Sequence, residues 1–517
     1  MERDRETDFD IIVAGAGHNG LVTAAYVAMA GLRVLVLEDR PIVGGNAVTE
    51  EHIPGYHFDT GSSSHSMIQS TPILKDDELG LLKHGLRYAF PEVLPIAILP
   101  DGYALEIHHS VEETARNIAQ ISRADADAYL NFEAEAREMA AVAGALGRTS
   151  IGDVDVSPEI RRKLSRRAWD VIAQRFSDPR IQSWLCQEAS ISLTPPDQAG
   201  TARFVYSAYV GRHSSNSSWG TAIGGSGALT DALQAAIERH GGVVKVGHRV
   251  TRILVDGDRA YGVECEDGSR FTANKAVVSS IHIKHLVDMV PPTSLPQEFR
   301  TAVDDYVPGV SIGTTYIASN EAPRFVGSNG VDTEALAAFI PGTLADSLGW
   351  GNRALLKQPS LHSAMMAVHT ATVLDPTRAV AGGHTIKCVT WQPYEVEGPG
   401  GWDALRDDLE QFHLATLRRF APNITPGKIV GTVTRTPLDL QRANLHNVGG
   451  NAHGGEQLIS QLWENRPAPG WANYRMPIAG LYQTGATTHP GGGIGGVSGR
   501  NAALAVLDDL GLSLQGN

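Results

Sequence analysis

The first 40 residues alternate between short apolar runs and one longer alanine-rich segment. Residues 9–14 (FDIIVA) and 33–38 (RVLVLE) are short and largely apolar, which is typical of strands buried on both faces. Between them, residues 21–29 have the composition of a helix packed on a sheet, and Gly31 follows as a helix terminator. This strand–helix–strand order predicts a parallel sheet covered by helices, and therefore an α/β fold.

Helical patterns dominate the middle of the chain, and strands return in its second half. We expect helices over 110–146, opened by a capping box of Ser110 and Glu113, and over much of 157–190. After a helix at 228–240, the pattern predicts strands at 243–246, 250–255, 260–266, 270–273 and 276–279. The last 40 residues return to a strand, a glycine loop and a helix.

Composition narrows the class of protein. With 517 residues, 42% hydrophobic and 19% charged, the chain is long enough for about two to four globular units. The net charge of −14 argues against general nucleic-acid binding, which needs a positive field. Three scattered cysteines without a CxxC pair predict no metal site and a reducing, cytoplasmic location. The charged segment 1–6 is unlike a signal peptide, and without a run of ~18 apolar residues we expect no integral membrane segment.

A phosphate-binding turn is predicted directly after the first strand. Residues 15–20 read G-x-G-x-x-G between a predicted strand and a predicted helix. Gly15 permits the tight turn, Gly17 permits close approach of a pyrophosphate, and Gly20 permits close helix–strand packing. The helix N-terminus offers N–H groups to the phosphates. Glu38 ends the second strand, where a carboxylate suits ribose hydroxyls, so the segment predicts a dinucleotide site.

Two further glycine motifs lie beyond this turn. Gly44, Gly45 and Asn46 follow the acid closely, and the motif at 55–61 (GYHFDTG) ends at Gly61. Near the C-terminus, residues 480–499 contain a strand, a turn, a glycine loop and the start of a helix. These segments resemble the flavin motifs of the amine oxidase and phytoene desaturase group. In that resemblance the final helix N-terminus faces the isoalloxazine ring of the flavin.

The resemblance narrows to the phytoene desaturase-like FAD-dependent oxidoreductases. The chain is similar to bacterial phytoene-dehydrogenase-related proteins and to pyridine nucleotide-disulphide oxidoreductase domain 2 proteins. The segments that support this narrower resemblance are HNGL at 18–21, Asp375-Pro376, Arg466-Pro467 and HPGGG at 489–493. The resemblance is strongest over residues 9–66, 221–285 and 440–505.

The family resemblance implies FAD as the cofactor and two domains. A Rossmann-type FAD-binding domain would be built from the discontinuous segments 1–70, 221–285 and 470–517, and a mixed α+β substrate-binding domain from 71–220 and 286–469. At Ala486 many relatives carry an acid, so a side-chain contact is lost there and a backbone contact remains. Carried over by motif, the residues implied to bind FAD are Gly15, Gly17, Gly20, Glu38, Gly44, Gly45, Asn46, Gly61, Val250, Gly485, Gly493, Gly496 and Val497.

Residues 491–496 also fit G-x-G-x-x-G, but we reject them as a second nucleotide site. The sequence ends at Asn517, which leaves no room for the second strand and ribose acid that the motif requires. No separate NAD(P) domain is evident. We therefore expect the flavin to exchange electrons with dioxygen, a quinone or the substrate itself.

Two histidines are candidates for chemistry beside the flavin, because the ordinary pKa of histidine lies near neutrality. His489 adjoins the C-terminal glycine loop, with a structural role in the turn as an even alternative. His65 follows the second flavin motif and could enter the same cavity, although a loop histidine bonded to its surroundings is the favoured interpretation. Asp59 is interpreted as a residue that fixes the turn rather than one that reacts.

The sequence thus predicts a FAD-dependent dehydrogenase or desaturase that removes two hydrogens from a small or lipophilic organic substrate. The alternatives are a flavin amine oxidase, a redox-neutral FAD-containing isomerase and a flavin-binding protein without turnover. An amine oxidase would need an aromatic pair facing the flavin. Basic residues at 161–167 suit a solvated helix face better than peripheral membrane contact. Membrane contact and homo-oligomer formation are both left open by the sequence.

Overall fold

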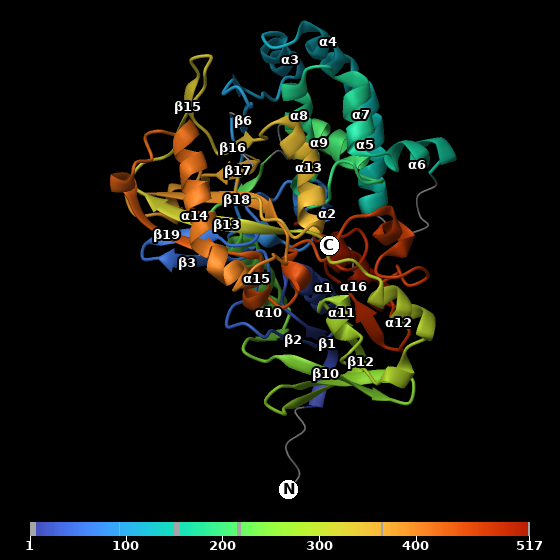
Figure 1. Ribbon diagram of the computed structural model, residues 1–517. Helices are drawn as coiled ribbons and strands as arrows, with labels where there is room; N and C mark the ends of the chain where they lie inside the picture. Colours follow the sequence, from blue (N-terminus) through green and yellow to red (C-terminus); the bar gives the residue numbers. More distant parts are fainter. Residues whose placement is uncertain (1–6, 93, 149–155, 215–218, 363–364, 515–517) are drawn as a thin grey trace.

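The computed structural model describes residues 7–92, 94–148, 156–214, 219–362 and 365–514, so the charged segment 1–6 lies outside the described residues. Figure 1 shows three parts: a sheet near the N-terminus, a second sheet above it and to the left, and a group of helices above it and to the right. Strands and helices from distant parts of the sequence contribute to each sheet. The mixed architecture agrees with the predicted α/β class.

Sheet I is a seven-stranded sheet in the described part of the chain, with β1 at its centre. Its order is β10-β11-β12-β1-β2-β9, and β20 pairs with β12. The strands β1, β2, β9, β20 and the second half of β12 run parallel. Their bounds are β1 Thr7–Ala14, β2 Val34–Leu37, β9 Val243–Lys245, β10 Val250–Asp256, β11 Arg259–Cys265, β12 Arg270–Ser279 and β20 Leu481–Gln483.

Both faces of the central strands of sheet I are buried, which explains why these strands are continuously apolar. In β1, Ile11 and Val13 belong to one hydrophobic cluster while Ile12 and Ala14 belong to another. The first cluster includes residues of α1 (His18–Met29), α10 (Gly227–Arg239) and α16 (Val497–Asp509). The second includes residues of α11 (Ile283–Leu286) and α12 (Gln297–Asp304).

One strand of sheet I is longer than the sequence pattern predicts. The pattern separates a hairpin strand at 270–273 from a buried strand at 276–279, but β12 runs unbroken from Arg270 to Ser279. Its first half pairs antiparallel with β11, and its second half pairs parallel with β1 and β20. The change from polar to apolar residues therefore marks a change of strand neighbours rather than a break. The hairpin turn does contain Gly268, at φ +81°.

Sheet II is the second seven-stranded sheet of the described residues, ordered β19-β13-β18-β17-β16-β6-β7. Apart from the parallel pair β16 and β6, its neighbours are antiparallel. The helix α14 (Gly401–Phe420) packs on this sheet through Leu414 and Leu417. The strand bounds are β6 Ile96–Ile98, β7 Ala104–Leu105, β13 Ser311–Ser319, β16 Ala337–Ile340, β17 Met366–His369, β18 His384–Gln392 and β19 Ile429–Arg435.

A group of seven helices, called here the helical layer, lies above sheet I in Figure 1. The segment 110–146, which the sequence predicts to be helical, forms three successive helices. The hydroxyl oxygen of Ser122 accepts a hydrogen bond from the Asp125 N–H, so a new helix begins after Ser122. The helices of the layer are α3 Val111–Ala119, α4 Arg123–Asn131, α5 Glu133–Arg148, α6 Pro158–Leu164, α7 Ala168–Arg175, α8 Pro179–Ala189 and α9 Ala202–Arg212.

Short elements connect the two sheets with the helical layer. Among them, the hairpin of β3 and β4 carries the second glycine motif, and α13 packs on α8. The bounds of these remaining elements are α2 Pro72–Lys75, α13 Leu344–Leu355, α15 Pro437–Ala443, β3 Thr49–Ile53, β4 Tyr56–Asp59, β5 Tyr88–Ala89, β8 Thr221–Ala222, β14 Arg324–Val326 and β15 Asp332–Glu334.

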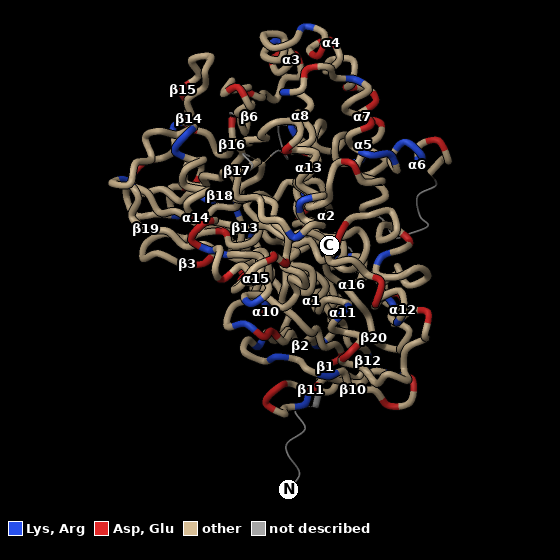
Figure 2. The backbone as a smooth tube through the Cα atoms, viewed as in Figure 1, with Lys and Arg blue, Asp and Glu red and all other residues tan. Residues whose placement is uncertain are grey.

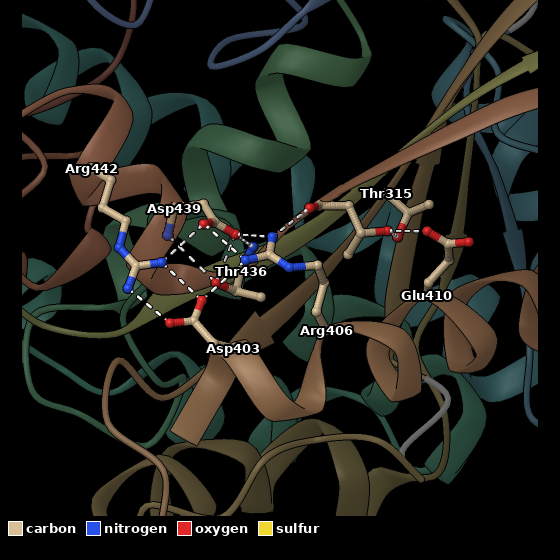
Figure 3. Close-up of polar contacts among 8 residues, drawn as sticks. Thr315, Asp403, Arg406, Glu410, Thr436, Asp439 and Arg442 are labelled. Carbon is tan, nitrogen blue, oxygen red and sulfur yellow. Dashed lines mark hydrogen bonds and ion pairs between the residues drawn. The ribbon is translucent and has the colours of Figure 1, made fainter. Parts of the chain in front are cut away.

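A polar network ties α14 to α15, as shown in Figure 3. Arg442 donates to both carboxylate oxygens of Asp403, at 2.8 and 2.9 Å, and Arg406 pairs with both Asp403 and Asp439. The network holds α15 against sheet II. The loop after α15 then presents Asn447, whose side-chain oxygen accepts a hydrogen bond from Asn46 at 2.8 Å. Sheet II thereby supports a residue that the sequence places at the cofactor.

Candidate flavin site at the carboxyl edge of sheet I

The parallel strands of sheet I end together at one edge, and the predicted cofactor residues follow these ends. Gly15 follows β1, Glu38 follows β2 and Thr484 follows β20. Ser280 follows β12, and its hydroxyl donates to the carbonyl oxygen of Gly15 at 2.9 Å. In open α/β sheets this edge is where ligands bind. Segments nearly 500 residues apart in the sequence therefore meet at a single site.

The three glycines of the first turn occupy different environments. A Cβ built on Gly15 (φ +95°) would lie 2.4 Å from the Ser280 hydroxyl, and one on Gly20 would lie 2.3 Å from the Gly15 carbonyl oxygen. Both positions require the absence of a side chain for packing. A Cβ on Gly17 would meet no atom within 4 Å, so the space beside this residue is open. The geometry at Gly15 and Gly20 agrees with the tight turn and the close helix packing that the motif predicts. Backbone approach by a ligand at Gly17 stays a prediction.

Glu38 lies at the end of β2 and is buried. One carboxylate oxygen accepts a hydrogen bond from the Ala16 N–H at 2.7 Å, and the other accepts one from the Arg40 N–H at 3.0 Å. Burial raises the pKa of Glu38, although these backbone donors partly oppose the shift. The Glu38 carboxylate thus holds the backbone of the phosphate-binding turn in place through Ala16. Each of its oxygens keeps a second lone pair with which to accept a ribose hydroxyl.

The segment predicted to hold adenine lies beside Glu38. The His248 N–H donates to the Glu38 carbonyl oxygen at 2.7 Å, and the Gly247 N–H donates to that of Arg40 at 3.2 Å. Val250, the first residue of β10, is buried two residues further on. This arrangement supports the implied backbone contact between Val250 and adenine. The contact itself stays a prediction.

The second flavin motif, which comprises residues 44–46 and 55–61, packs directly on the phosphate-binding turn at 15–20. Gly44 forms a bridge with Gly17, and a Cβ built on Gly45 (φ +62°) would lie 3.1 Å from the Gly17 Cα. The Ser62 N–H donates to the Asn46 carbonyl oxygen at 2.9 Å, and a Cβ on Gly61 would lie 2.2 Å from the same oxygen. Backbone segments at 15–17, 44–46 and 61–62 therefore form one continuous wall of the site.

The C-terminal motif closes the opposite side. The Gly485 N–H donates to the Ser498 hydroxyl at 2.9 Å, which joins the turn after β20 to the first turn of α16. Gly496 (φ +69°) is the N-cap of α16, and Val497 begins the helix. Gly493 (φ +114°) lies against Met67, whose side chain is half exposed beside it. Helices α1 and α16 both begin at this edge.

The features of this edge fit FAD. An open approach at Gly17 and a helix N-terminus suit a pyrophosphate, and a buried carboxylate follows the neighbouring strand where a ribose would lie. The extended wall from Gly17 to Gly61 suits a long cofactor. His18, the first residue of α1, is a neighbour that the motif does not single out. Burial, together with the nearby His65, lowers its pKa to about 4.

His65 and His489, the two candidates for catalysis, differ in their surroundings. His65 is buried, and its ring nitrogens lie 2.8 Å from the Tyr88 hydroxyl and 3.0 Å from the Ser226 hydroxyl. Burial lowers the pKa of His65 to about 4. These bonds favour the structural interpretation for this residue. His489 is also buried, and its carbonyl oxygen accepts a hydrogen bond from Tyr474 at 3.0 Å, which holds the glycine loop.

A buried charged cluster packs against the second flavin motif, and apart from Asp59 its residues belong to no sequence motif. Arg378 pairs with Asp59 at 2.9 Å, while Lys387 of β18 donates to the Gly61 carbonyl oxygen at 2.7 Å. A cavity of about 10 Å³ among these side chains also borders His369, and it can hold one water molecule. Burial lowers the pKa of Lys387 to about 8, although Asp59 opposes the shift. The residues of this cluster come from distant parts of the sequence, so no local motif predicts it.

Asp59 has the structural role that the sequence suggests. Burial alone would raise its pKa, but Arg378 and the Ser226 N–H outweigh that effect, and the pKa is lowered. One of its oxygens accepts hydrogen bonds from the Ser226 N–H and the Thr49 hydroxyl, both at 2.8 Å. The carboxylate therefore joins the β3–β4 hairpin to the start of α10.

Two of the three basic residues of α6 are paired with acids. Arg161 contacts Glu464 at 2.9 Å, and Lys163 contacts Glu159 at 3.4 Å. Figure 2 shows basic and acidic positions side by side on this helix. The pairing favours a solvated helix face, as the sequence suggests, over an anionic lipid surface. Within the described ranges, no helix has both the length and the apolar character needed to cross a membrane.

The fold and this edge define a flavoenzyme. The chain belongs to the flavin containing amine oxidoreductase family, whose model matches residues 20–323, more than half of its 517 residues. It is therefore a FAD-dependent oxidoreductase, in agreement with the cofactor predicted from the sequence.

Individual relatives cover nearly the whole chain. Pyridine nucleotide-disulfide oxidoreductase domain-containing protein 2 of Rattus norvegicus is 27% identical over 97% of this chain and 94% of its own length. A lycopene-forming phytoene desaturase of a Paracoccus species is 26% identical, with 96% and 97% covered. The solved structure of cyclohexylamine oxidase from Brevibacterium oxydans superposes with a TM-score of 0.61 at 17% identity, with 98% and 100% covered. The predicted resemblance to the phytoene desaturase-like group is thus confirmed.

Proposed function

We propose that the protein is a dehydrogenase or desaturase that removes two hydrogens from an organic substrate. The bond oxidised would be a carbon–carbon bond, or one between carbon and oxygen or nitrogen, in a small or lipophilic molecule. The observation that carries the proposal is the meeting of the three flavin motifs at the edge of sheet I, with the buried His489 in the loop between β20 and α16. The similarity to a phytoene desaturase supports the carbon–carbon case.

In this proposal FAD binds along the wall formed by residues 15–17, 44–46 and 61–62, with Glu38 at the ribose and Val250 at the adenine. Gly485, Gly493, Gly496 and Val497 would line its other side. The segments 1–70, 221–285 and 470–517 would then form the FAD domain, and 71–220 and 286–469 the substrate domain. Bound FAD supplies a hydride acceptor, which is chemistry that protein side chains lack.

In this proposal a residue of the chain removes the second hydrogen as a proton. His489 is the residue we propose for this step, with the proton accepted at a ring nitrogen. Tyr474 holds the His489 carbonyl oxygen, and Asn501 donates to the Tyr474 hydroxyl at 3.0 Å. These bonds fix the loop and limit the positions that the imidazole can reach. A fixed base contributes typically 10²–10⁴-fold to a rate.

An amine oxidase is the second candidate, supported by the fold shared with cyclohexylamine oxidase. Such an enzyme would need an aromatic pair facing the flavin. Of the aromatic residues that could supply one, Tyr474 and Tyr482 belong to the hydrophobic cluster between sheet I and helices α1, α10 and α16. Trp391 packs on Trp350 with ring centroids 6.5 Å apart. These placements give the amine oxidase little support.

Anaerobic mixing with candidate substrates tests the proposal. A terpene hydrocarbon, a carboxylic acid and a primary amine would each be mixed with FAD-saturated protein, and the flavin absorbance band would be followed. Bleaching by the hydrocarbon or the acid supports dehydrogenation, whereas bleaching by the amine alone supports the amine oxidase. Photoreduction is the control that shows the flavin to be reducible. An unchanged band with every substrate, in protein that photoreduces normally, would favour the redox-neutral or non-catalytic alternatives.

For the return of electrons we propose dioxygen or a quinone. Photoreduced protein would be mixed with air or with a short-chain ubiquinone, and the faster reoxidation identifies the acceptor. We also propose a cytoplasmic location, which is supported by three free, buried cysteines.

A further inference from the structure

Arg203 lies in the first turn of α9, on the side of the helical layer that faces the glycine loop. Its Nη2 donates to the side-chain oxygen of Gln457 at 2.6 Å, and its guanidinium carbon lies 4.3 Å from the Phe204 ring centroid. Its Nε is buried and has no hydrogen-bond partner among the described residues. The guanidinium therefore leaves several of its five donors unused.

No described carboxylate lies within ion-pair distance of Arg203, in contrast to two other arginines of the layer. Arg212 on the same helix pairs with Glu188, and Arg175 pairs with Glu135. The neighbouring charge is instead Arg466, a second buried cation whose side chain donates only to backbone carbonyl oxygens. Burial, together with Arg466, lowers the pKa of Arg203 to about 9. Arg203 as a whole is partly exposed, but its Nε is buried. A partly buried cation with a second cation beside it and no counter-ion is costly, so the pair suits an anion from outside.

The side chain of Gln457 lies between Arg203 and the C-terminal flavin motif. The Cδ atom of Gln457 lies 3.7 Å from a Cβ built on Gly491, within the loop that also contains His489. The helical layer approaches the same loop through α5, where a Cβ on Gly147 would lie 3.9 Å from the Pro490 side chain. An anion bound by Arg203 would therefore lie between the helical layer and the loop that we place beside the flavin.

We propose that Arg203 binds a carboxylate of the substrate. The inference rests on the proposed function and names its substrate class, an organic acid with an oxidisable carbon chain. A guanidinium presents paired donors that match the two oxygens of a carboxylate, and Gln457 fixes the plane of that fork. Two adjacent cations would also repel a protonated amine. The arrangement therefore selects against the substrates of an amine oxidase.

Calorimetric titration of FAD-saturated protein tests the proposal with benzoate and octanoate as carboxylate probes. Benzamide and octylamine are the neutral and cationic counterparts. We expect the carboxylates to bind more tightly than either counterpart. Arg203→Gln should weaken carboxylate binding roughly tenfold to a hundredfold, as expected for a lost charge-assisted bond. Arg203→Lys keeps the positive charge but loses the paired donors of the guanidinium. We expect its affinity for carboxylates to lie between those of the wild type and Arg203→Gln.

The matched control is Arg161→Gln, because Arg161 lies on α6 of the same layer and is 46% exposed. It should leave carboxylate binding unchanged. Melting temperature and FAD content of each variant show whether it is folded and loaded. The proposal is overturned if neither carboxylate binds, if Arg203→Gln binds them as the wild type does, or if that variant loses FAD instead. The last result would assign the guanidinium to the cofactor's phosphates. Carboxylate binding that depends on Arg203 without flavin bleaching by any substrate would leave this inference standing and overturn the proposed dehydrogenation.

Discussion

The Nζ atom of Lys387 lies 2.7 Å from the carbonyl oxygen of Gly61, and so a buried ammonium group of sheet II holds the backbone of the second flavin motif. The same Nζ donates to the Ser63 hydroxyl at 3.1 Å. No carboxylate among the described residues pairs directly with this lysine, and Asp59, which acts on it electrostatically, is paired with Arg378. Sheet II is thus joined to the segment after the β3–β4 hairpin by a cation in a low-dielectric environment.

Replacement of Lys387 by methionine should change how stability depends on pH. Burial lowers the pKa of Lys387 from its ordinary 10.5 to about 8, so between these values the unfolded chain binds more protons than the folded protein. The free energy of unfolding of the wild type should therefore increase as pH rises from about 8 to 10.5, relative to that of Lys387→Met, which has no such titrating group. The difference between the two melting temperatures should grow in favour of the wild type across this range. Lys75→Met, at an exposed lysine on α2, is the control, and a constant difference would contradict the shifted pKa.

Glu38→Ala should weaken FAD binding roughly tenfold to a hundredfold, because a charge-assisted hydrogen bond is worth ~1.5–3 kcal/mol. The structure adds a second reason, since the variant also removes the acceptor for the Ala16 N–H in the phosphate-binding turn. Glu38→Gln keeps one acceptor oxygen and should lose less. Flavin fluorescence during titration of the apoprotein measures the dissociation constant. Glu298→Ala, an exposed acid on α12, serves as the control, and equal affinities for all variants would place the ribose elsewhere.

The local parts of the site were predictable from the sequence because their chemistry is local. Gly15, Gly17 and Gly20 lie within six residues, and each spacing has a geometric reason that the structure reproduces. The strand Val34–Leu37 and its terminal acid were predictable for the same reason. Helix boundaries were less predictable from the sequence. Ser122, for example, caps a new helix by accepting a hydrogen bond from the Asp125 N–H, and this bond competes with continuation of the preceding helix.

The buried charges could not be predicted, because their partners are distant in the sequence. Lys387 lies 326 residues from Gly61, and Arg203 lies 254 residues from Gln457. Neither belongs to a motif, and a lysine in the pattern of β18 gives no sign that it is buried. His65 shows the opposite case, since the sequence correctly placed it near the second motif but could not show that Tyr88 and Ser226 bond its ring.

For His65 we expect a mainly structural effect. Its ring is hydrogen-bonded to Tyr88 and Ser226. His65→Ala removes the partner of the Tyr88 hydroxyl, which costs ~1–3 kcal/mol, while the Ser226 hydroxyl keeps its bonds to Ser62. The melting temperature should fall, while the rate of flavin reduction in FAD-saturated variant should stay within a few-fold of wild type. Stopped-flow absorbance and thermal unfolding together make the measurement. A large drop in reduction rate without loss of stability would reinstate His65 as a catalytic residue.

His413 should contribute to acid sensitivity. It lies on α14, buried between the hydroxyls of Thr315 and Thr390 at 2.8 and 2.9 Å. Burial lowers its pKa from 6.5 to about 3, so the unfolded chain binds the proton first as pH falls, and this contribution to stability is lost from pH 6.5 downwards. His413→Gln should be less stable at pH 7, and the difference in melting temperature should narrow at pH 5. His240→Gln, at an exposed position, should match wild type at both pH values, and an unchanged difference for His413→Gln would contradict the assignment.

His489 is the decisive residue for the proposed reaction. It lies in the loop between β20 and α16, is 1% exposed, and its carbonyl oxygen is held by Tyr474. If the imidazole accepts the substrate proton, His489→Ala should retain FAD but reduce it ~10²–10⁴-fold more slowly. If the role is structural, the same variant should bind FAD weakly and melt earlier, with near-normal reduction of the protein that remains loaded.

Tyr474→Phe separates these two roles for His489. The variant removes only the hydroxyl that holds the loop, so it should lower stability and loosen FAD while leaving the imidazole in place. Rapid mixing of FAD-saturated His489→Ala and Tyr474→Phe with the same substrate then compares loss of the base with loss of its support. We expect the reduction rate to fall far more in His489→Ala than in Tyr474→Phe. Equal rates in the two variants would remove His489 from the chemistry and leave it as part of the cofactor-binding loop.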